Sequence, residues 1–395
     1  MPLFIWSSIF STLVAVALIR AVRQFRCYES LPDDRAMSRD EMPSVNAIVP
    51  MRNEEGNIGA CLDGLRAQDY PHDRLDMIVV DDNSSDGSSA IVRRHAAAEG
   101  RVRLMSAGPL PAACAGKPHA CWQGALDARS EWLCFLDADT IAAPPLLRAA
   151  IAFARARQLD MLSLAPFQEL RFFFDRLLLP FGFLAIAATQ DLARVNSATS
   201  SAATANGQCL LIRARSYFAV GGHHAVRDEI CEDAALACRM KAAGYRFALL
   251  GAERFIRARM YGSLGELWEG LSKNITEVYG GPAATLAVSA AALFLGWSAL
   301  PLLAATLAAA IADPTAASVT AAAAALAADG AFFGTAIALA LRLKIPWWHG
   351  LLSPLAATIG AAIAVNGVIA RARGRVLWKG RVYAAAGTAT IRSNR

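Results

Sequence analysis

Residues 75–89 read LDMIVVDDNSSDGSS, and this stretch indicates the fold of the central part of the chain. Leu75 to Val80 is a short apolar run typical of a buried strand, and it ends in Asp81-Asp82. The Ser/Asp/Gly cluster after it predicts a turn, and Ser89 to Ala98 is predicted to form a helix. The stretch therefore predicts a strand, an acidic turn and a helix in succession.

The same succession recurs on both sides of this stretch. After the run SVNAIVP at 44–50, apolar residues recur at helical spacing. The other predicted elements are a helix through Ile58, Cys61, Leu62 and Leu65, strands at Val102–Met105 and Trp132–Leu136, and a helix from about Pro118 to Ala128. Strands that alternate with helices predict an α/β domain with a mainly parallel sheet covered on both faces.

Polar clusters follow three of the predicted strands. They are Arg52-Asn53-Glu54, Asp81-Asp82-Asn83 and Asp137-Ala138-Asp139. In a parallel sheet, ligands bind beyond the carboxyl ends of the strands, where these turns converge. The sequence therefore predicts one binding site that contains all three clusters.

The carboxylates of Asp137 and Asp139 suit Mg²⁺ or Mn²⁺ bridging a diphosphate, because such ions prefer oxygen ligands. A solvated turn or a helix cap is the alternative. Asp82 is placed to accept hydrogen bonds from a base or ribose. Lys117, at a predicted helix N-terminus in AGKPHA, is placed to meet phosphate or base, and a solvated lysine is its alternative.

Glu232-Asp233 begins the segment CEDAALACRMKAAGY, which predicts a helix with both carboxylates in its first turn. Complementation of the helix dipole alone would explain an acidic first turn. In a site that transfers a group to a hydroxyl, such a carboxylate removes the acceptor proton.

Membrane segments are expected at both ends of the chain, of which 55% is hydrophobic. Leu3 to Ile19 has no charge, and at about 1.5 Å per residue it reaches roughly 26 Å, close to a bilayer's thickness. Arg20, Arg23 and Arg26 follow it and favour an uncleaved anchor with a cytoplasmic body over a signal peptide. We expect a multi-pass protein of the cell inner or plasma membrane.

Three apolar blocks occupy the C-terminal third: Ala283–Ala312, Thr315–Leu341 and Gly350–Ala370. Three crossings would place the basic tail outside, whereas its Arg and Lys residues favour the cytoplasm. Pro301 would allow the first block to split, so the number of crossings stays open. The expected division is an anchor at 1–26, a catalytic domain at 40–280 with an interfacial element at 171–194, membrane helices at 283–370 and a cytoplasmic tail at 371–395.

Other compositional features are less specific. The net charge of +6 suits an anionic membrane surface, and no basic stripe with interleaved aromatics predicts a nucleic-acid partner. The eight cysteines show no CxxC pair or zinc spacing, so reduced thiols are expected, with Cys61 and Cys134 as core residues.

Seven motifs in order resemble family 2 glycosyltransferases with a GT-A fold, between about Val45 and Asn274. They read VNAIVPMRNEE, VVDDNSSDGS, AGKPHA, FLDADT, ANGQCLL, VGGHHAVRDEICEDAALACRMKAAGY and RARMYGSLGELWEGLSKN. Within the family, the chain is similar to membrane-attached enzymes that glycosylate carotenoids, hopanoids or ceramide.

This resemblance implies a role for each matching residue and an inverting, single-sugar transfer to a lipid in glycolipid biosynthesis. The donor would be a nucleotide-sugar, by default UDP-glucose, with UDP-galactose, UDP-N-acetylglucosamine and GDP-mannose left open. The implied residues are Pro50, Arg52, Glu54, Asp82, Lys117 and Asp137 for the nucleotide-sugar, Asp137 and Asp139 for the metal, Asp233 with Glu232 for catalysis, and Gln208, Arg259, Trp268 and Lys273 for acceptor or diphosphate.

One departure concerns the QxxRW signature of processive synthases and ceramide glucosyltransferases, which is not evident in RARMYGSLGELWEGLSKN. Its Arg, Trp and Lys residues would equally suit a membrane interface. A processive polysaccharide synthase is the main alternative function. A transporter or an inactive nucleotide-binding scaffold is less consistent, because few polar residues fall in the apolar blocks and the site carboxylates are present.

Overall fold

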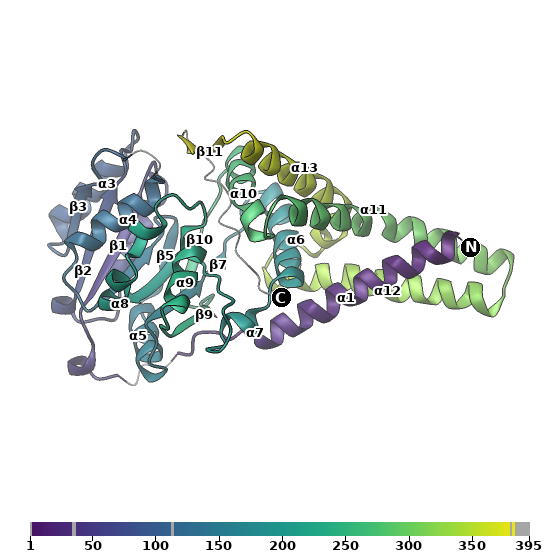
Figure 1. The fold of residues 1–395 in the computed structure, drawn as a ribbon, viewed down its shortest axis with the longest axis horizontal. Helices are drawn as coiled ribbons and strands as arrows, with labels where there is room; N and C mark the ends of the chain where they lie inside the picture. Colours follow the sequence, from purple (N-terminus) through teal and green to yellow (C-terminus); the bar gives the residue numbers. More distant parts are fainter. Residues whose placement is uncertain (1, 34–36, 112–113, 380, 384–395) are drawn as a thin grey trace. The chain divides into compact units, whose positions relative to one another are not determined.

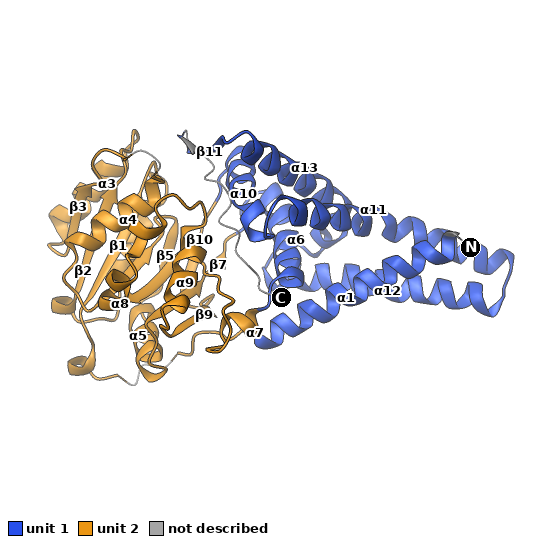
Figure 2. Ribbon diagram, in the orientation of Figure 1, with its two compact units in different colours: residues 1–27, 170–191, 261–392 blue, residues 28–169, 192–260, 393–395 orange. Residues whose placement is uncertain are grey.

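The computed structural model describes residues 2–33, 37–111, 114–379 and 381–383. The chain divides into two compact units, each assembled from separated segments (Figure 2). The sheet unit contains Tyr28–Glu169 and Leu192–Met260, and the helix unit contains residues 2–27, Leu170–Asp191 and 261–383.

A mixed seven-stranded sheet forms the centre of the sheet unit (Figure 1). Its strands in spatial order are β3 (Val102–Ser106), β2 (Leu75–Asp81), β1 (Val45–Met51), β4 (Trp132–Leu136), β8 (Cys209–Arg213), β6 (Met161–Ala165) and β9 (Phe247–Gly251). β3, β2, β1 and β4 are parallel, as are β6 and β9, and β8 runs antiparallel to both of its neighbours. The predicted mainly parallel sheet is confirmed.

Helices cover both faces of this sheet because the strand side chains alternate in direction. Ala47 and Val49 of β1 join a core cluster with α2 (Ile58–Arg66), α3 (Ser88–Ala98) and α5 (Leu146–Ala156). Ile48 joins a second cluster with α4 (Gly116–Asp127), α8 (Ala214–Ala219) and α9 (Glu232–Ala242). Each face therefore has its own hydrophobic core.

Smaller elements complete the sheet unit. They are a three-stranded sheet of β5 (Thr140–Ala142), β10 (Ile256–Ala258) and β7 (Phe167–Gln168), the helix α7 (Leu192–Val195), and the 3₁₀ turns η1 (Arg39–Glu41), η2 (His72–Arg74) and η3 (Gly222–Val226). All eight cysteines lie in described residues and none forms a disulfide; Cys61 and Cys134 are buried.

The helix unit contains four helices long and apolar enough to cross a membrane, as judged over the described residues. Its elements are α1 (Pro2–Cys27), α6 (Phe173–Thr189), α10 (Leu264–Val278), α11 (Pro282–Ala312), α12 (Ala316–Arg342), η4 (Trp347–Leu352), α13 (Ser353–Ala372), β11 (Val376–Trp378) and β12 (Arg381–Tyr383). Large apolar side chains such as Ile19, Trp297 and Ile311 are exposed on their outer faces. Such faces suit contact with lipid.

α11 continues through Pro301 as one 31-residue helix, so the first apolar block does not split there. A proline removes one backbone hydrogen bond, and a long helix between neighbours tolerates that loss. Phe294 of α11 packs on Trp6 and Phe10 of α1, with ring centroids 5.9 and 6.3 Å apart. α1 and α11 are thus held together by aromatic contacts.

α13 runs from the middle of α11 to α10. Near its start, Gly296 of α11 approaches Ser353 and Pro354 so closely that a Cβ there would lie 3.2 Å from the Ser353 carbonyl oxygen. Near its end, Asn366 donates to Ser272 Oγ of α10 at 3.0 Å, and Arg371 forms an ion pair with Glu277. α13 therefore ends beside the helix that precedes α11.

Candidate active site

The turns after β1 and β2 interlock at the carboxyl edge of the sheet. The Arg52 guanidinium donates to the backbone carbonyls of Asp82 and Asn83 at 2.7 and 3.1 Å. Asn53 and Asn83 adopt φ values of 51° and 58°, which asparagine tolerates better than most residues. Arg52 therefore fixes the turn that carries Asp82, a buried carboxylate.

Two other residues predicted to contact the nucleotide lie beside these turns. Pro50 is in β1, in register with Val80 of β2. The Glu54 backbone N–H donates to Ser88 Oγ at 2.8 Å, and its carboxylate accepts from Asn57 at 2.9 Å. Both hold the end of β1 against the turn before α3.

The Asp137-Ala138-Asp139 turn connects β4 to β5. Thr140 secures it, because its N–H and hydroxyl donate to the Asp137 carbonyl at 3.1 and 2.6 Å. The Asp137 N–H donates to the carbonyl of Gln208, and the Asp139 carbonyl accepts from the Arg259 N–H at 2.9 Å. The two carboxylates therefore lie on a turn that the backbone holds from both sides.

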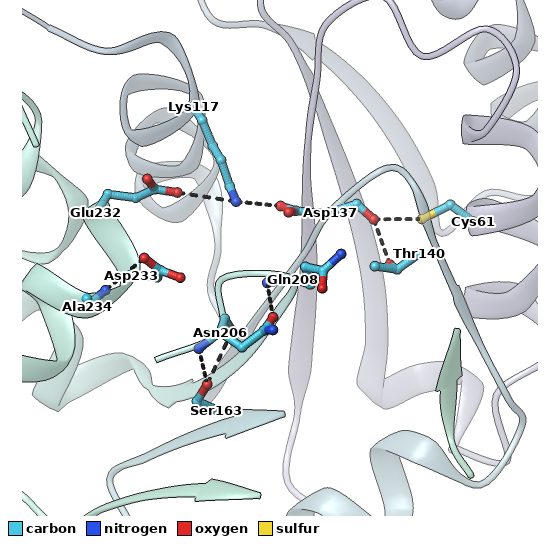
Figure 3. Close-up of polar contacts among 10 residues, drawn as sticks. All are labelled: Cys61, Lys117, Asp137, Thr140, Ser163, Asn206, Gln208, Glu232, Asp233 and Ala234. Carbon is cyan, nitrogen blue, oxygen red and sulfur yellow. Dashed lines mark hydrogen bonds and ion pairs between the residues drawn. The ribbon is translucent and has the colours of Figure 1, made fainter. Parts of the chain in front are cut away.

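Lys117 lies between carboxylates from two distant parts of the chain (Figure 3). Its Nζ is 2.7 Å from Asp137 Oδ1 and 3.2 Å from Glu232 Oε1. Burial opposes its charge, but the two carboxylates outweigh burial and hold the pKa of Lys117 well above its ordinary value. Lys117 therefore remains a cation at the metal turn.

Asp233 follows Glu232 in the first turn of α9 and points toward the same cluster (Figure 3). Burial, reinforced by the Glu232 carboxylate, raises the pKa of Asp233 to about 6, and Lys117 opposes that rise. The Ala234 N–H donates to Asp233 Oδ1 at 2.8 Å. This carboxylate is held in place and has a basicity suited to proton transfer near neutral pH.

Gly207 approaches Asp233 closely, and the sequence reasoning did not single it out. A Cβ at Gly207 would lie 2.9 Å from Asp233 Oδ2, closer than real side chains tolerate. Asn206-Gly207 is a turn dipeptide just before β8, which is the signal that would have identified it.

Gln208, which begins this strand's polar end, is largely buried and accepts from Gln168 Nε2 at 2.8 Å. Among the residues that the structure describes, its own Nε2 has no hydrogen-bond partner. Gln168, which the sequence reasoning also missed, orients this amide.

The remaining predicted residues lie elsewhere. The Arg259 guanidinium is 2.8 Å from the Glu169 carboxylate, within the sheet unit. Trp268 and Lys273 belong to α10 of the helix unit, where Trp268 joins an apolar cluster and Lys273 Nζ lies 5.1 Å from the Trp378 ring centroid. Their contacts are with other parts of α10's own unit.

The residues of the metal turn fit a divalent ion held partly by substrate. Within the described residues, no three or more His, Cys, Asp or Glu side chains gather as a metal site. Mg²⁺ in phosphate-binding sites needs only one or two carboxylates, because phosphates and water complete its coordination. Asp137 and Asp139 provide that pair, and Asp137 already attracts the ammonium group of Lys117.

The fold and the site together define a nucleotide-sugar-binding class of protein, and comparison with known proteins identifies its family. Residues 46–173 match the family described as glycosyl transferase family 2, and this part of the chain belongs to that family. A solved mannosyltransferase, PcManGT from Pyrobaculum calidifontis in complex with GDP-Man and Mn²⁺, superimposes with a TM-score of 0.53 at 22% identity. The match covers 93% of this chain and 98% of that one and shows a GT-A fold.

A curated relative is the 4,4'-diaponeurosporenoate glycosyltransferase of Staphylococcus aureus strain MRSA252, with 26% identity over 241 residues. The alignment covers 60% of this chain and 62% of the relative, so the chain spans about three fifths of the length of the relatives it matches.

The close approach of Gly207 to Asp233 makes a testable prediction. Gly207→Ala is expected to lower kcat by about a hundredfold, because a displacement near 1 Å at a reacting group has that effect. Donor affinity and Tm should change little. Gly59→Ala is the matched control, since a Cβ there meets Ile91 at an ordinary 3.7 Å. Equal kcat in both variants would contradict the placement of Asp233.

Proposed function

We propose that the protein transfers one sugar from a nucleotide-sugar to a lipid acceptor at a membrane, with inversion at the anomeric carbon. The observation that carries this proposal is the cluster in which Lys117 joins Asp137 to Glu232 beside Asp233. It combines a cation, a carboxylate pair for a metal and a carboxylate with raised pKa at the ligand-binding edge of the sheet.

The proposed chemistry assigns a separate task to each group. Asp233 accepts the proton of the acceptor hydroxyl while that oxygen attacks the anomeric carbon and the bond to the diphosphate breaks. Lys117 and the Gln208 amide donate to phosphate oxygens, and Asp82 hydrogen-bonds the nucleoside. Mg²⁺ or Mn²⁺, held by Asp137 and Asp139, would offset the charge that develops on the leaving diphosphate.

The donor is proposed as UDP-glucose by default. UDP-galactose, UDP-N-acetylglucosamine and GDP-mannose remain alternatives, and GDP-Man is the ligand named for the mannosyltransferase with the same fold. The chain's own contribution to this choice lies in the Asp82 turn, which Arg52 holds in position. A panel of the four labelled donors would identify which one is used.

A lipid acceptor is supported by the helix unit. Four apolar helices with exposed apolar faces would hold the protein in a bilayer, where a lipid presents its polar end at the interface. The named substrate of the Staphylococcus aureus relative is a long-chain carotenoid acid. We extend to this chain only the lipid class of that acceptor.

The arrangement of α13 supports a cytoplasmic tail. α11 and α12 form one outward and return passage, and α13 begins beside the middle of α11 and ends at α10. It therefore adds no third complete crossing, which places both α10 and the basic residues after α13 on one side of the membrane. Arg371 and Arg373 then follow the positive-inside rule together with Arg23 and Arg26.

The test uses purified full-length protein, labelled nucleotide-sugar and total membrane lipid. Label is expected to enter the organic phase with wild type and to remain in the aqueous phase with Asp233→Asn. Conversion of donor to free sugar at the same rate with and without lipid would contradict a lipid acceptor. No donor turnover under any condition would indicate the nucleotide-binding scaffold instead.

A further inference from the structure

A cleft lies wholly within the helix unit, between α6, the second half of α12, η4 and the start of α13. It encloses about 310 Å³ of empty space, part of which is open to the surroundings. This volume falls at the lower end of the range of about 300 to 1,000 Å³ for small-ligand sites. The walls are mainly apolar, with Leu177, Phe181 and Leu184 on one side and Ala336 and Ala340 on the other.

Two buried polar side chains interrupt these apolar walls. His349 and Ser353 both line the cleft and are only 6% and 2% exposed. In the part of the chain that the structure describes, His349 Nε2 and Ser353 Oγ have no hydrogen-bond partner. A buried polar atom without a partner is costly, so two of them in one cleft indicate a ligand that satisfies both.

The contacts of His349 determine what its free nitrogen can do. Its Nδ1 lies 3.1 Å from the carbonyl oxygen of Pro346, and a carbonyl can only accept a hydrogen bond. Nδ1 therefore carries the proton in the neutral ring, which leaves Nε2 as an acceptor. The group that Nε2 meets must donate a proton.

The cleft is also rigid at this point. The Trp348 ring stacks on the His349 ring with centroids 3.8 Å apart, and Phe173 lies 5.9 Å from it. Gly350 allows η4 to pack on α12, since a Cβ there would lie 2.7 Å from the Ile337 nitrogen. Arg176 at the cleft is already engaged, because it donates to the carbonyls of Leu170 and Arg171.

We propose that this cleft binds a membrane lipid through a hydroxyl group. The lipid hydroxyl donates to His349 Nε2 and accepts from the Ser353 hydroxyl, and the apolar chain lies along the walls formed by α6 and α12. An ionised carboxylic acid does not fit, because it has no proton to donate to Nε2. The proposal rests on the helix unit alone and does not depend on the role assigned to Asp233.

The test is photolabelling of the full-length protein in lipid nanodiscs with a long-chain alcohol that carries a diazirine, compared with its methyl ether. The alcohol should label the peptides around Leu177–Leu184 and Ser353–Ala356 about fivefold to tenfold more than the ether, as expected for one or two hydrogen bonds. Because the ether cannot donate, the difference reports on His349 directly.

Four variants complete the experiment. His349→Leu and Ser353→Ala should each reduce labelling by the alcohol, whereas His349→Gln, which keeps an acceptor, should retain part of it. Thr358→Ala is the matched control, because Thr358 is exposed on the same helix and bonds Trp297 instead. Equal labelling by alcohol and ether, or undiminished labelling of His349→Leu at an unchanged Tm, would overturn the proposal.

Discussion

Asp233→Asn is expected to lower kcat by about a hundredfold to ten-thousandfold, the range in which general bases contribute. Donor affinity should be unchanged, because Asp233 is assigned to the acceptor's proton and not to the nucleotide. Single-turnover rates with saturating donor, together with donor binding measured by calorimetry, separate the two effects. Full turnover by Asp233→Asn would exclude this residue as the base.

The pH profile of kcat tests the same residue without changing it. Since a base must be ionised and the pKa of Asp233 is raised to about 6, kcat should fall as pH decreases through that value. The charged groups that face Asp233 are Glu232 and Lys117, with Asp137 beyond Lys117.

Glu232→Gln is the matched variant, because it removes the neighbouring charge that raises the pKa of Asp233. The midpoint of its pH profile should move downward, and some activity should remain. If Glu232→Gln alone abolishes turnover while Asp233→Asn does not, the base is Glu232.

Asp139→Asn is expected to reduce transfer on the order of a hundredfold or more, because metal stabilisation of a leaving diphosphate is worth several kcal/mol. The variant should also bind Mn²⁺ more weakly in the presence of a nucleoside diphosphate, which electron paramagnetic resonance measures independently of turnover. Wild type in EDTA should show a similar loss of activity, restored by added Mn²⁺ or Mg²⁺.

Asp63→Asn is the control for this variant, since Asp63 is exposed on α2 and pairs with Arg66. Its activity and its Mn²⁺ binding should match wild type. Undiminished transfer in EDTA, or unchanged Mn²⁺ binding by Asp139→Asn, would remove the metal from the mechanism.

The fold of the sheet unit was predictable because its signals are local. The apolar run at Leu75–Val80 and the helical spacing of Ile58, Cys61, Leu62 and Leu65 place β2 and α2 within a residue of their observed bounds. The acidic turns after the strands were equally visible. The predicted helix near Pro118 begins at Gly116, so Lys117 lies inside its first turn, where proline is well tolerated.

The contacts that shape the site were not predictable, because they join residues far apart in sequence. The ion pairs of Lys117 with Asp137 and Glu232 depend on how α4, β4 and α9 meet at one edge of the sheet. Nothing local distinguishes Gly207 from other turn glycines until Asp233 is placed beside it.

The same limit applies to the helix unit. The segment after Tyr261 continues directly from the sheet unit in sequence, yet α10 groups with α13 through residues near the other end of the chain. Hydropathy identified the apolar blocks but not the point at which α13 begins along α11. That level decides how many complete crossings follow the sheet unit, and only tertiary contacts specify it.

The most direct test of the central claim is the mass of the lipid product. The full-length protein, supplied with nucleotide-sugar, Mn²⁺ and total membrane lipid, should yield an organic-extractable product that is heavier than its lipid acceptor by one sugar. Nuclear magnetic resonance of that product should show the anomeric configuration opposite to that of the donor. A ladder of products with increasing numbers of sugars, or label found only in a water-soluble polymer, would contradict single-sugar transfer and indicate a processive synthase.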